Sequence, residues 1–331
     1  MSYARARDIA VDDIPVIDVG PLAGGGAAAV ADVGAQMREA AERIGFFYIR
    51  NHGIAEQLIR DTDAMARRFF HFPQQKKLEV APLDRHRGFL GIGEAKMYKN
   101  AKVDLKESFI WGLDSGAAEA DYLAGNRMMG PNRWPAWLPE MRPLLNDYFT
   151  ASHACAAMLL RALAVSLDAP EDYFVRRLVK PVSRGALVWY PPQPPDAGEQ
   201  QFGVAPHTDY GVITLLRQDQ VGGLQVATRG GEWVTAHPIE GTLVVNSGDL
   251  LGRWSNDRFK SNPHRVVNSS GRERLSIAMF VDPDYDTPIT PVVQAGETSH
   301  YEPVSCGEYI LGRFDKAFAY REKRDKEAGQ S

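Results

Sequence analysis

The sequence predicts a mostly β protein in which a jelly-roll or small-barrel core follows a helical N-terminal layer. Helical spacing of apolar residues is concentrated in the first half of the 331-residue chain. From about residue 181, short β-branched and aromatic runs alternate with Gly, Pro, Asn and Asp, which is typical of a many-stranded antiparallel sheet. We expect these strands to close into a barrel or to pack as two sheets, because either arrangement removes exposed strand edges.

The N-terminal region is expected to combine short strands with amphipathic helices. Residues 14–19 have the composition of a short strand, and residues 45–53 that of a buried strand closed by a turn. Helical spacing covers three stretches, 27–44, 55–70 and 141–167. The third is long enough to be the backbone of the layer, and we assign residues 1–180 to an N-terminal mixed α/β region.

The β-rich core is assigned to residues 181–285. Its candidate strands are residues 185–190, 212–217, 224–227, 242–246, 264–268 and 275–281. A proline-rich loop at 191–195 lies inside this core, since strand-like sequence flanks it on both sides. Residues 286–331 are expected to form a C-terminal extension with a helix, whose end carries charges of alternating sign.

Composition and charge restrict the class of partner. The chain has 38 basic and 42 acidic residues and a net charge of -4, so it lacks the basic excess that neutralises a phosphate backbone. Its opening residues contain no apolar signal segment, and no later run reaches the length of a membrane span. We expect a cytoplasmic protein that acts on a small molecule, without nucleic acid, membrane or an obligate protein partner.

The cysteine count limits the kind of metal site. Cys155 lies in an apolar helical stretch and Cys306 in a predicted loop, and these are the two cysteines of the chain. Two buried thiols are expected rather than a disulfide framework. Thiolate zinc and iron–sulfur sites need about four soft ligands at short spacings. A metal in this protein must therefore be held by histidine and carboxylate.

One histidine–carboxylate pair has the context of a metal site. His207-Thr208-Asp209 lies between predicted strands, and in a strand residues i and i+2 share a face. With 42 acidic residues, eight histidines produce about one such pair by chance, and His300-Tyr301-Glu302 is a second. His264 begins another predicted strand after the first pair, whereas no histidine follows the second. We therefore expect His207, Asp209 and His264 to bind the metal.

Two histidines and one carboxylate on one side of a metal leave positions open for a co-substrate and O₂. That arrangement is diagnostic of oxygen-activating Fe(II). A zinc hydrolase can use the same residue types, but the helical H-E-x-x-H pattern is absent from the sequence. The alternative is that the three side chains are polar residues at the rim of a sheet. No catalytic residue beyond the metal site is assigned.

A candidate anion site follows the metal residues. Arg274-Leu275-Ser276 places a guanidinium and a hydroxyl on one face of a predicted core strand. A buried arginine needs an anionic partner, because an unpaired buried charge is costly. That partner is either a protein carboxylate or, with the Tyr190 hydroxyl, the distal carboxylate of a dicarboxylate bound to iron.

Several ordered motifs resemble those of one family, the isopenicillin-N-synthase-like branch of the iron(II)/2-oxoglutarate-dependent dioxygenases. The resemblance spans nearly the whole chain. It is carried by Ile14-Pro-Val-Ile-Asp18, Gly45-Phe-Phe-Tyr-Ile-Arg-Asn-His-Gly-Ile54, Lys106-Glu-Ser-Phe109, Tyr190-Pro-Pro192, His207-Thr-Asp209, Asn246-Ser-Gly-Asp249, His264-Arg-Val266 and Arg274-Leu-Ser276. We expect the Asn246 motif to be a turn between core strands rather than a ligand set.

This resemblance implies a double-stranded β-helix with a helical N-terminal layer, and Fe(II) held by His207, Asp209 and His264. It further implies that Arg274 and Ser276, helped by Tyr190, hold 2-oxoglutarate. The expected reaction consumes O₂, releases succinate and CO₂, and hydroxylates, desaturates or cyclises a small molecule. Plant members often carry Asn-Tyr-Tyr-Pro where this chain has Val188-Trp-Tyr-Pro191, so one secondary contact to the co-substrate is absent or replaced.

The substrate is not identified by the sequence. Arg87, Lys96 and Tyr98 lie in a glycine-rich segment that resembles the family's variable segment over the metal, and they suit a small polar or anionic substrate. The predicted pocket-wall residues are Tyr210, Phe280 and Phe314. Alternative functions are an Fe(II)/O₂ oxidase that does not use 2-oxoglutarate, an ethylene/succinate-forming enzyme, and a non-catalytic metal-binding β-barrel. Succinate formation under iron and O₂ distinguishes the oxygenase from the oxidase and the non-catalytic barrel.

Overall fold

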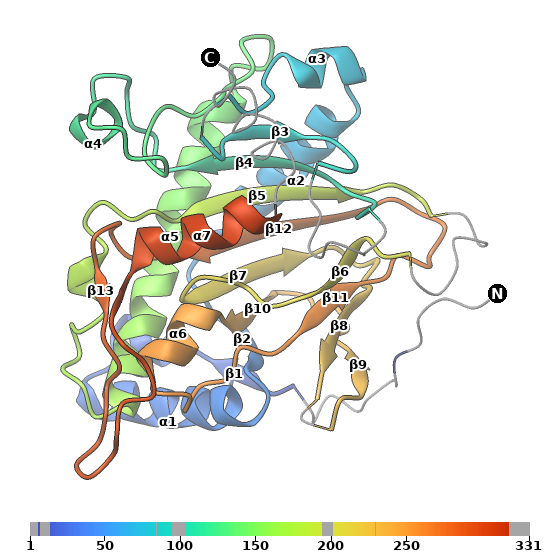
Figure 1. Cartoon of the computed structure of the whole chain (residues 1–331). Coiled ribbons are helices and arrows are strands. Elements are labelled where there is room, and N and C mark those ends of the chain that lie inside the picture. Colours follow the sequence, from blue (N-terminus) through green and yellow to red (C-terminus); the bar gives the residue numbers. More distant parts are fainter. Residues whose placement is uncertain are drawn as a thin grey trace.

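Two facing β-sheets form the centre of the protein, and helices cover the outer face of the larger one (Figure 1). The computed structural model describes residues 6, 14–83, 85–94, 103–193, 201–228 and 230–317. The larger sheet contains, in spatial order, β1 (Val16–Asp18), β2 (Phe46–Arg50), β10 (Thr242–Ser247), β7 (Ile213–Gln218), β12 (Arg274–Val281), β5 (Arg184–Tyr190), β4 (Glu107–Gly112) and β3 (Gly88–Leu90).

The smaller sheet faces the larger one and carries two of the expected metal ligands. It contains, in spatial order, β6 (Val204–His207), β11 (His264–Val266), β8 (Leu224–Ala227) and β9 (Trp233–Thr235). A separate hairpin pairs β13 (Pro288–Ile289) with β14 (Val304–Ser305). Strand pairing is antiparallel except between β1 and β2, which run parallel because the helical crossover α1 joins them.

The helices gather mainly on one face of the larger sheet. They are η2 (Gly20–Ala23), α1 (Ala27–Arg43), α2 (Glu56–Phe70), α3 (Gln74–Leu78), α4 (Ala120–Leu123), α5 (Met141–Ser166), η3 (Val175–Arg177), α6 (Asp249–Trp254) and α7 (Cys306–Ala317). Helix α5 is the central one and packs against α1 and α2. Gly34 of α1 permits this approach, since a Cβ there would lie 2.6 Å from the Ala162 carbonyl oxygen.

Helix α5 corrects one expectation from the sequence. At 26 residues it is long and apolar enough, by length and composition, to cross a membrane, whereas we expected no run of that kind. Its apolar side chains lie in the core that joins the helices to the larger sheet. That packing accounts for the composition, because a core helix needs the same apolar residues as a membrane span.

The two faces of the larger sheet have different roles, which follow from the alternation of side chains along β12. Leu275, Ile277 and Met279 pack with the helices in the main hydrophobic core. The intervening residues point to the opposite face, toward the smaller sheet, where a second apolar cluster contains Ala278 and Phe280. The space between the sheets is therefore where polar side chains of β12 must find their partners.

The predicted fold class is confirmed, with the helical N-terminal layer and the double-stranded β-helix core. All six candidate core strands are present, although the one expected at 264–268 ends at Val266, and β6 and β9 were not predicted. Both cysteines are buried and free, as expected, but Cys306 begins α7 instead of lying in a loop. Strands β1 to β4, which precede residue 180, lie in the same larger sheet as strands that follow it. The three-part division of the chain stays a prediction.

Candidate active site

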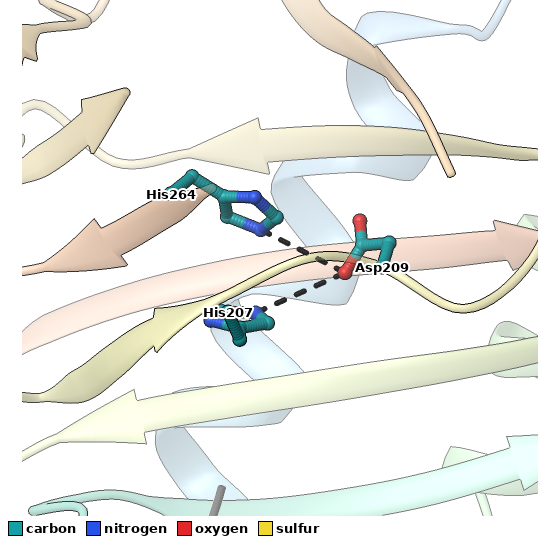
Figure 2. Close-up of side chains that lie close together, drawn as sticks. All are labelled: His207, Asp209 and His264. Atoms are coloured by element: carbon teal, nitrogen blue, oxygen red, sulfur yellow. Dashed lines mark ion pairs between the residues drawn. The ribbon is translucent and has the colours of Figure 1, made fainter. Parts of the chain in front are cut away.

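His207, Asp209 and His264 converge between the two sheets (Figure 2). His207 ends β6 and is the register partner of His264 in β11. The Nε2 atoms of His207 and His264 lie 3.8 Å and 3.7 Å from Asp209 Oδ1. Two atoms that each bind one ion at about 2.1 Å can be at most about 4.2 Å apart. Both histidine–carboxylate separations therefore fit a single shared cation.

The convergence is not produced in the way the sequence suggested. We expected His207 and Asp209 to share a face of one strand, but β6 ends at His207 and Asp209 lies in the following loop. The loop turns the carboxylate toward both imidazoles. Within the described residues, no other group of three histidine, cysteine or acidic side chains has this arrangement.

Backbone carbonyl groups orient both imidazole rings. His207 Nδ1 lies 2.9 Å from the Ala205 carbonyl oxygen, and His264 Nδ1 lies 3.3 Å from that of Asn262. A ring that donates from Nδ1 keeps Nε2 free as a metal ligand. Burial, together with the neighbouring His264 ring, lowers the pKa of His207 well below its ordinary value. His207 is thus held in the neutral form that binds metals.

Two side chains of the larger sheet hold the Asp209 carboxylate. Its Oδ2 atom accepts hydrogen bonds from Thr214 Oγ1 at 2.5 Å and from Asn246 Nδ2 at 2.7 Å, which leaves Oδ1 for a metal. Burial opposes ionisation, but the two imidazoles and these two hydrogen bonds lower the pKa of Asp209 below its ordinary value. The carboxylate is therefore ionised and fixed in orientation.

The turn expected for residues 246–249 begins later than predicted. Asn246 belongs to the candidate strand 242–246 and lies within β10, opposite Thr214 of β7, and the chain turns only at Gly248 before α6. The pairing brings both polar side chains to the inner face of the sheet beside Asp209. The available signal was an Asn at the end of an apolar predicted strand, directly after Val244 and Val245, because a buried amide requires a hydrogen-bond partner.

Thr214→Val is expected to weaken Fe(II) binding by about 10- to 100-fold, the range typical of side chains that orient metal ligands. The substitution removes the hydroxyl donor to Asp209 while preserving side-chain shape. Anaerobic Fe(II) titration measures the effect. Thr242→Val is the matched control, because the Thr242 hydroxyl in β10 donates to the Ile239 carbonyl oxygen at 2.7 Å and does not contact Asp209. Equal affinities in the two variants would contradict the assigned role.

The second histidine–carboxylate pattern lies away from this centre. His300 is exposed, and its Nδ1 atom lies 2.9 Å from Asp257 Oδ2. Glu302 is exposed and contributes its backbone carbonyl to Arg253. These contacts form a surface network, which agrees with the choice of the first pattern as the metal site.

Arg274 lies in the interior with an incomplete set of partners. Its side chain is fully buried, its Nε donates to the Gly222 carbonyl oxygen, and its Nη1 lies 3.3 Å from Ser276 Oγ. The guanidinium lies 4.6 Å from the centre of the Tyr190 ring. Its Nη2 is buried and has no hydrogen-bond partner among the described residues. The three predicted anion-binding residues are therefore adjacent, with a donor still to be satisfied.

A pocket opens beside the metal ligands on the inner face of the larger sheet. The space between its lining side chains, including the open mouth, is about 830 Å³. His207 and Asp209 contribute to its wall together with Lys106, Ser108, Val188 and Arg184. The pocket thus connects the metal centre with the face of β5.

The predicted substrate residues are only partly brought to this pocket. Tyr210, Phe280 and Phe314 line it, and Phe314 comes from α7. Arg87 is buried close behind the lining, and Lys96 and Tyr98 lie outside the described residues. Arg184 was missed from the sequence, although alternation along β5 places it on the same face as Tyr190.

Comparison with known proteins agrees with this geometry. Residues 14–137 match the non-haem dioxygenase in morphine synthesis N-terminal family, and residues 175–283 match the 2OG-Fe(II) oxygenase superfamily. The 2-oxoglutarate-Fe(II) type oxidoreductase hxnY of Emericella nidulans is 37% identical over 330 residues, covering 96% of this chain and 93% of the relative. The homoarginine-6-hydroxylase 2-ODD-233 of Oryza sativa is 33% identical, covering 90% and 95%.

A solved structure extends the similarity to three dimensions. A full-length Neurospora crassa protein, crystallised with alpha-KG and thymine, superposes with a TM-score of 0.82 at 30% identity, covering 93% of this chain and 98% of that one. The two-histidine, one-carboxylate donor set fits Fe(II), and the orphaned donor of Arg274 fits an anion. The protein is an Fe(II)/2-oxoglutarate-dependent oxidoreductase whose iron ligands are His207, Asp209 and His264. The chain belongs to the 2OG-Fe(II) oxygenase superfamily, in its isopenicillin-N-synthase-like branch.

Proposed function

We propose that this enzyme oxidises a small molecule in the pocket beside the triad, and that Arg274, Ser276 and Tyr190 hold the distal carboxylate of 2-oxoglutarate. The observation that carries the co-substrate assignment is the buried Nη2 of Arg274, which lacks a partner among the described residues. A buried donor left unsatisfied costs about 1–3 kcal/mol, and more when it is charged. A carboxylate in contact with Arg274 would remove that cost.

The chain's own residues prepare the site in three ways. Backbone carbonyls fix the imidazoles, Thr214 and Asn246 fix Asp209, and the two sheets with α7 enclose the pocket. Bound Fe(II), 2-oxoglutarate and O₂ supply oxidation of a C–H bond, with release of succinate and CO₂. The apolar wall of Ile110, Phe280 and Phe314 limits water at the reacting carbon.

Hydroxylation is the outcome that we propose for the substrate, supported by relatives whose names describe hydroxylases. Desaturation and ring closure use the same iron site and are distinguished by product mass. A cytoplasmic location stays a prediction, as does the absence of an obligate protein partner.

The proposal is tested with the full-length protein loaded anaerobically with Fe(II) and titrated with 2-oxoglutarate. Exposure to O₂ with a panel of small molecules should then produce succinate at a rate that the correct substrate increases. Binding without any succinate would favour a non-catalytic protein, and oxidation of a panel member without succinate would favour an oxidase. Either result would overturn the proposed function.

A further inference from the structure

We propose that the substrate carries a carboxylate, which Arg184 binds directly, while Arg87 adds positive charge from behind. The inference rests on the proposed function and specifies the substrate class of the same site. The part of the substrate outside the carboxylate is expected to be apolar, because the pocket wall beside Arg184 includes Ile110, Ala186 and Phe280. Arg184 is thus a substrate-recognition residue, and Arg87 supports it.

Strand register separates this arginine from the co-substrate site. Along β5 and β12 the facing pairs are Tyr190 with Arg274 at one end and Arg184 with Phe280 at the other. Tyr190 lies six positions after Arg184 along β5, which corresponds to about 20 Å at about 3.3 Å per residue. Both residues lie on the inner face of the sheet. A five-carbon dicarboxylate anchored at Arg274 is too short to reach Arg184, so the two arginines serve different anions.

Among the described residues, buried positive charge exceeds buried negative charge around Arg184. The Arg184 guanidinium lies 3.2 Å from the carboxylate of the fully buried Asp282, which also accepts a hydrogen bond from the Val212 amide. Arg87 is 3% exposed and donates to the Met128 carbonyl oxygen at 3.0 Å, but no carboxylate of the described residues lies within 4 Å of it. Within the described part of the chain, one carboxylate, that of Asp282, thus lies at ion-pair distance from these two buried cations.

The remaining charges of the pocket do not correct this imbalance. Lys106 Nζ lies 3.8 Å from Asp104 Oδ2, so these two charges balance each other. The Asp209 carboxylate is a metal ligand, so its charge is balanced by the metal. Burial, and secondly the positive charge of Arg184, lower the pKa of Arg87, which reflects the energetic cost of burying a guanidinium group beside another one. A substrate carboxylate would relieve that cost.

Local packing holds both guanidinium groups in place. Gly112 of β4 is the register partner of Arg184, and a Cβ at Gly112 would lie only 2.2 Å from Cζ of Arg87. The glycine therefore leaves the space in which Arg87 lies beside Arg184. Phe314 of α7 covers Arg184, whose Cζ lies 4.4 Å from the ring centre, and Phe280 flanks it at 5.6 Å. These rings exclude water, which strengthens a charge-assisted contact.

The test compares matched pairs of an aromatic or alicyclic carboxylate and its neutral primary amide. Benzoate with benzamide, phenylacetate with phenylacetamide, and cyclohexanecarboxylate with cyclohexanecarboxamide are titrated calorimetrically into the anaerobic Fe(II) enzyme. Saturating 2-oxoglutarate is present, so the probes cannot occupy the Arg274 site. At least one carboxylate should bind about 10- to 100-fold more tightly than its amide, the ratio expected for a charge-assisted hydrogen bond.

Arg184→Gln should abolish this preference and leave the affinity for the amide nearly unchanged. Arg87→Gln should reduce the preference by about 10-fold, and it leaves the Arg184–Asp282 pair intact, so it tests the idea even if the first variant folds poorly. Arg217→Gln is the matched control, because Arg217 is an arginine of the same sheet that pairs with Asp63 of α2. The control should retain the full preference.

The outcomes separate this inference from the proposed function. If 2-oxoglutarate binds and supports succinate formation, but no carboxylate exceeds its amide, the carboxylate assignment is wrong and the proposed function stands. A preference that survives in both arginine variants would also overturn the assignment. If 2-oxoglutarate itself fails to bind, the proposed function fails first.

Discussion

Alanine at His207 or Asp209 is expected to abolish stoichiometric iron binding and turnover. Each substitution removes one of three ligands, so its effect should exceed the roughly 10- to 100-fold loss typical of residues that only orient a ligand. Asp209 has the greater influence, since it supplies the negative charge of the triad and lies within 3.8 Å of both imidazoles. Metal content after anaerobic Fe(II) loading and gel filtration measures the loss directly.

His300→Ala is the matched control for this experiment. It removes a histidine from the same type of sequence pattern, but His300 is an exposed residue that pairs with Asp257. Iron content and succinate formation should therefore equal those of the wild type. If His207→Ala or Asp209→Ala retained full metal content and turnover, the ligand assignment would be wrong.

Arg274→Ala is expected to weaken 2-oxoglutarate binding by about 10- to 150-fold, from about 1.5–3 kcal/mol for a charge-assisted hydrogen bond. Arg274 is fully buried, with one donor unsatisfied among the described residues, so its loss removes the charge that would neutralise the distal carboxylate. Arg274→Lys should recover only part of the affinity, because lysine lacks the planar fork that binds a carboxylate through two hydrogen bonds. Anaerobic calorimetry on the iron-loaded protein measures both.

Arg87→Gln is the control for Arg274, since it also removes a buried arginine near the pocket. Its affinity for 2-oxoglutarate should remain within about twofold of the wild type, whereas its preference for carboxylate probes should fall. Unchanged 2-oxoglutarate affinity in Arg274→Ala would remove the anchor assignment. Iron content must be measured in every variant, so that a loss of co-substrate binding is not confused with a loss of metal.

The sequence alone determined the parts of this protein that local pattern encodes. Strand periodicity located all six candidate core strands, and apolar spacing located α1, α2 and α5. The ordered motifs identified the three iron ligands and, with them, the superfamily. These features were accessible because neighbouring residues on a strand or helix share a face at a fixed spacing.

Tertiary structure decided which distant residues meet. Asn246 and Thr214 reach Asp209 because β10 and β7 pair in one particular register, which the candidate strands by themselves did not give. Arg184 and Arg87 come together only because β4 lies beside β5 and places Gly112 opposite Arg184. Periodicity gives the face of a residue but not its neighbour across the sheet, since register depends on the packing of the whole chain. The iron centre could thus be predicted from the sequence, whereas the groups that orient it and the charge that selects the proposed substrate came from the fold.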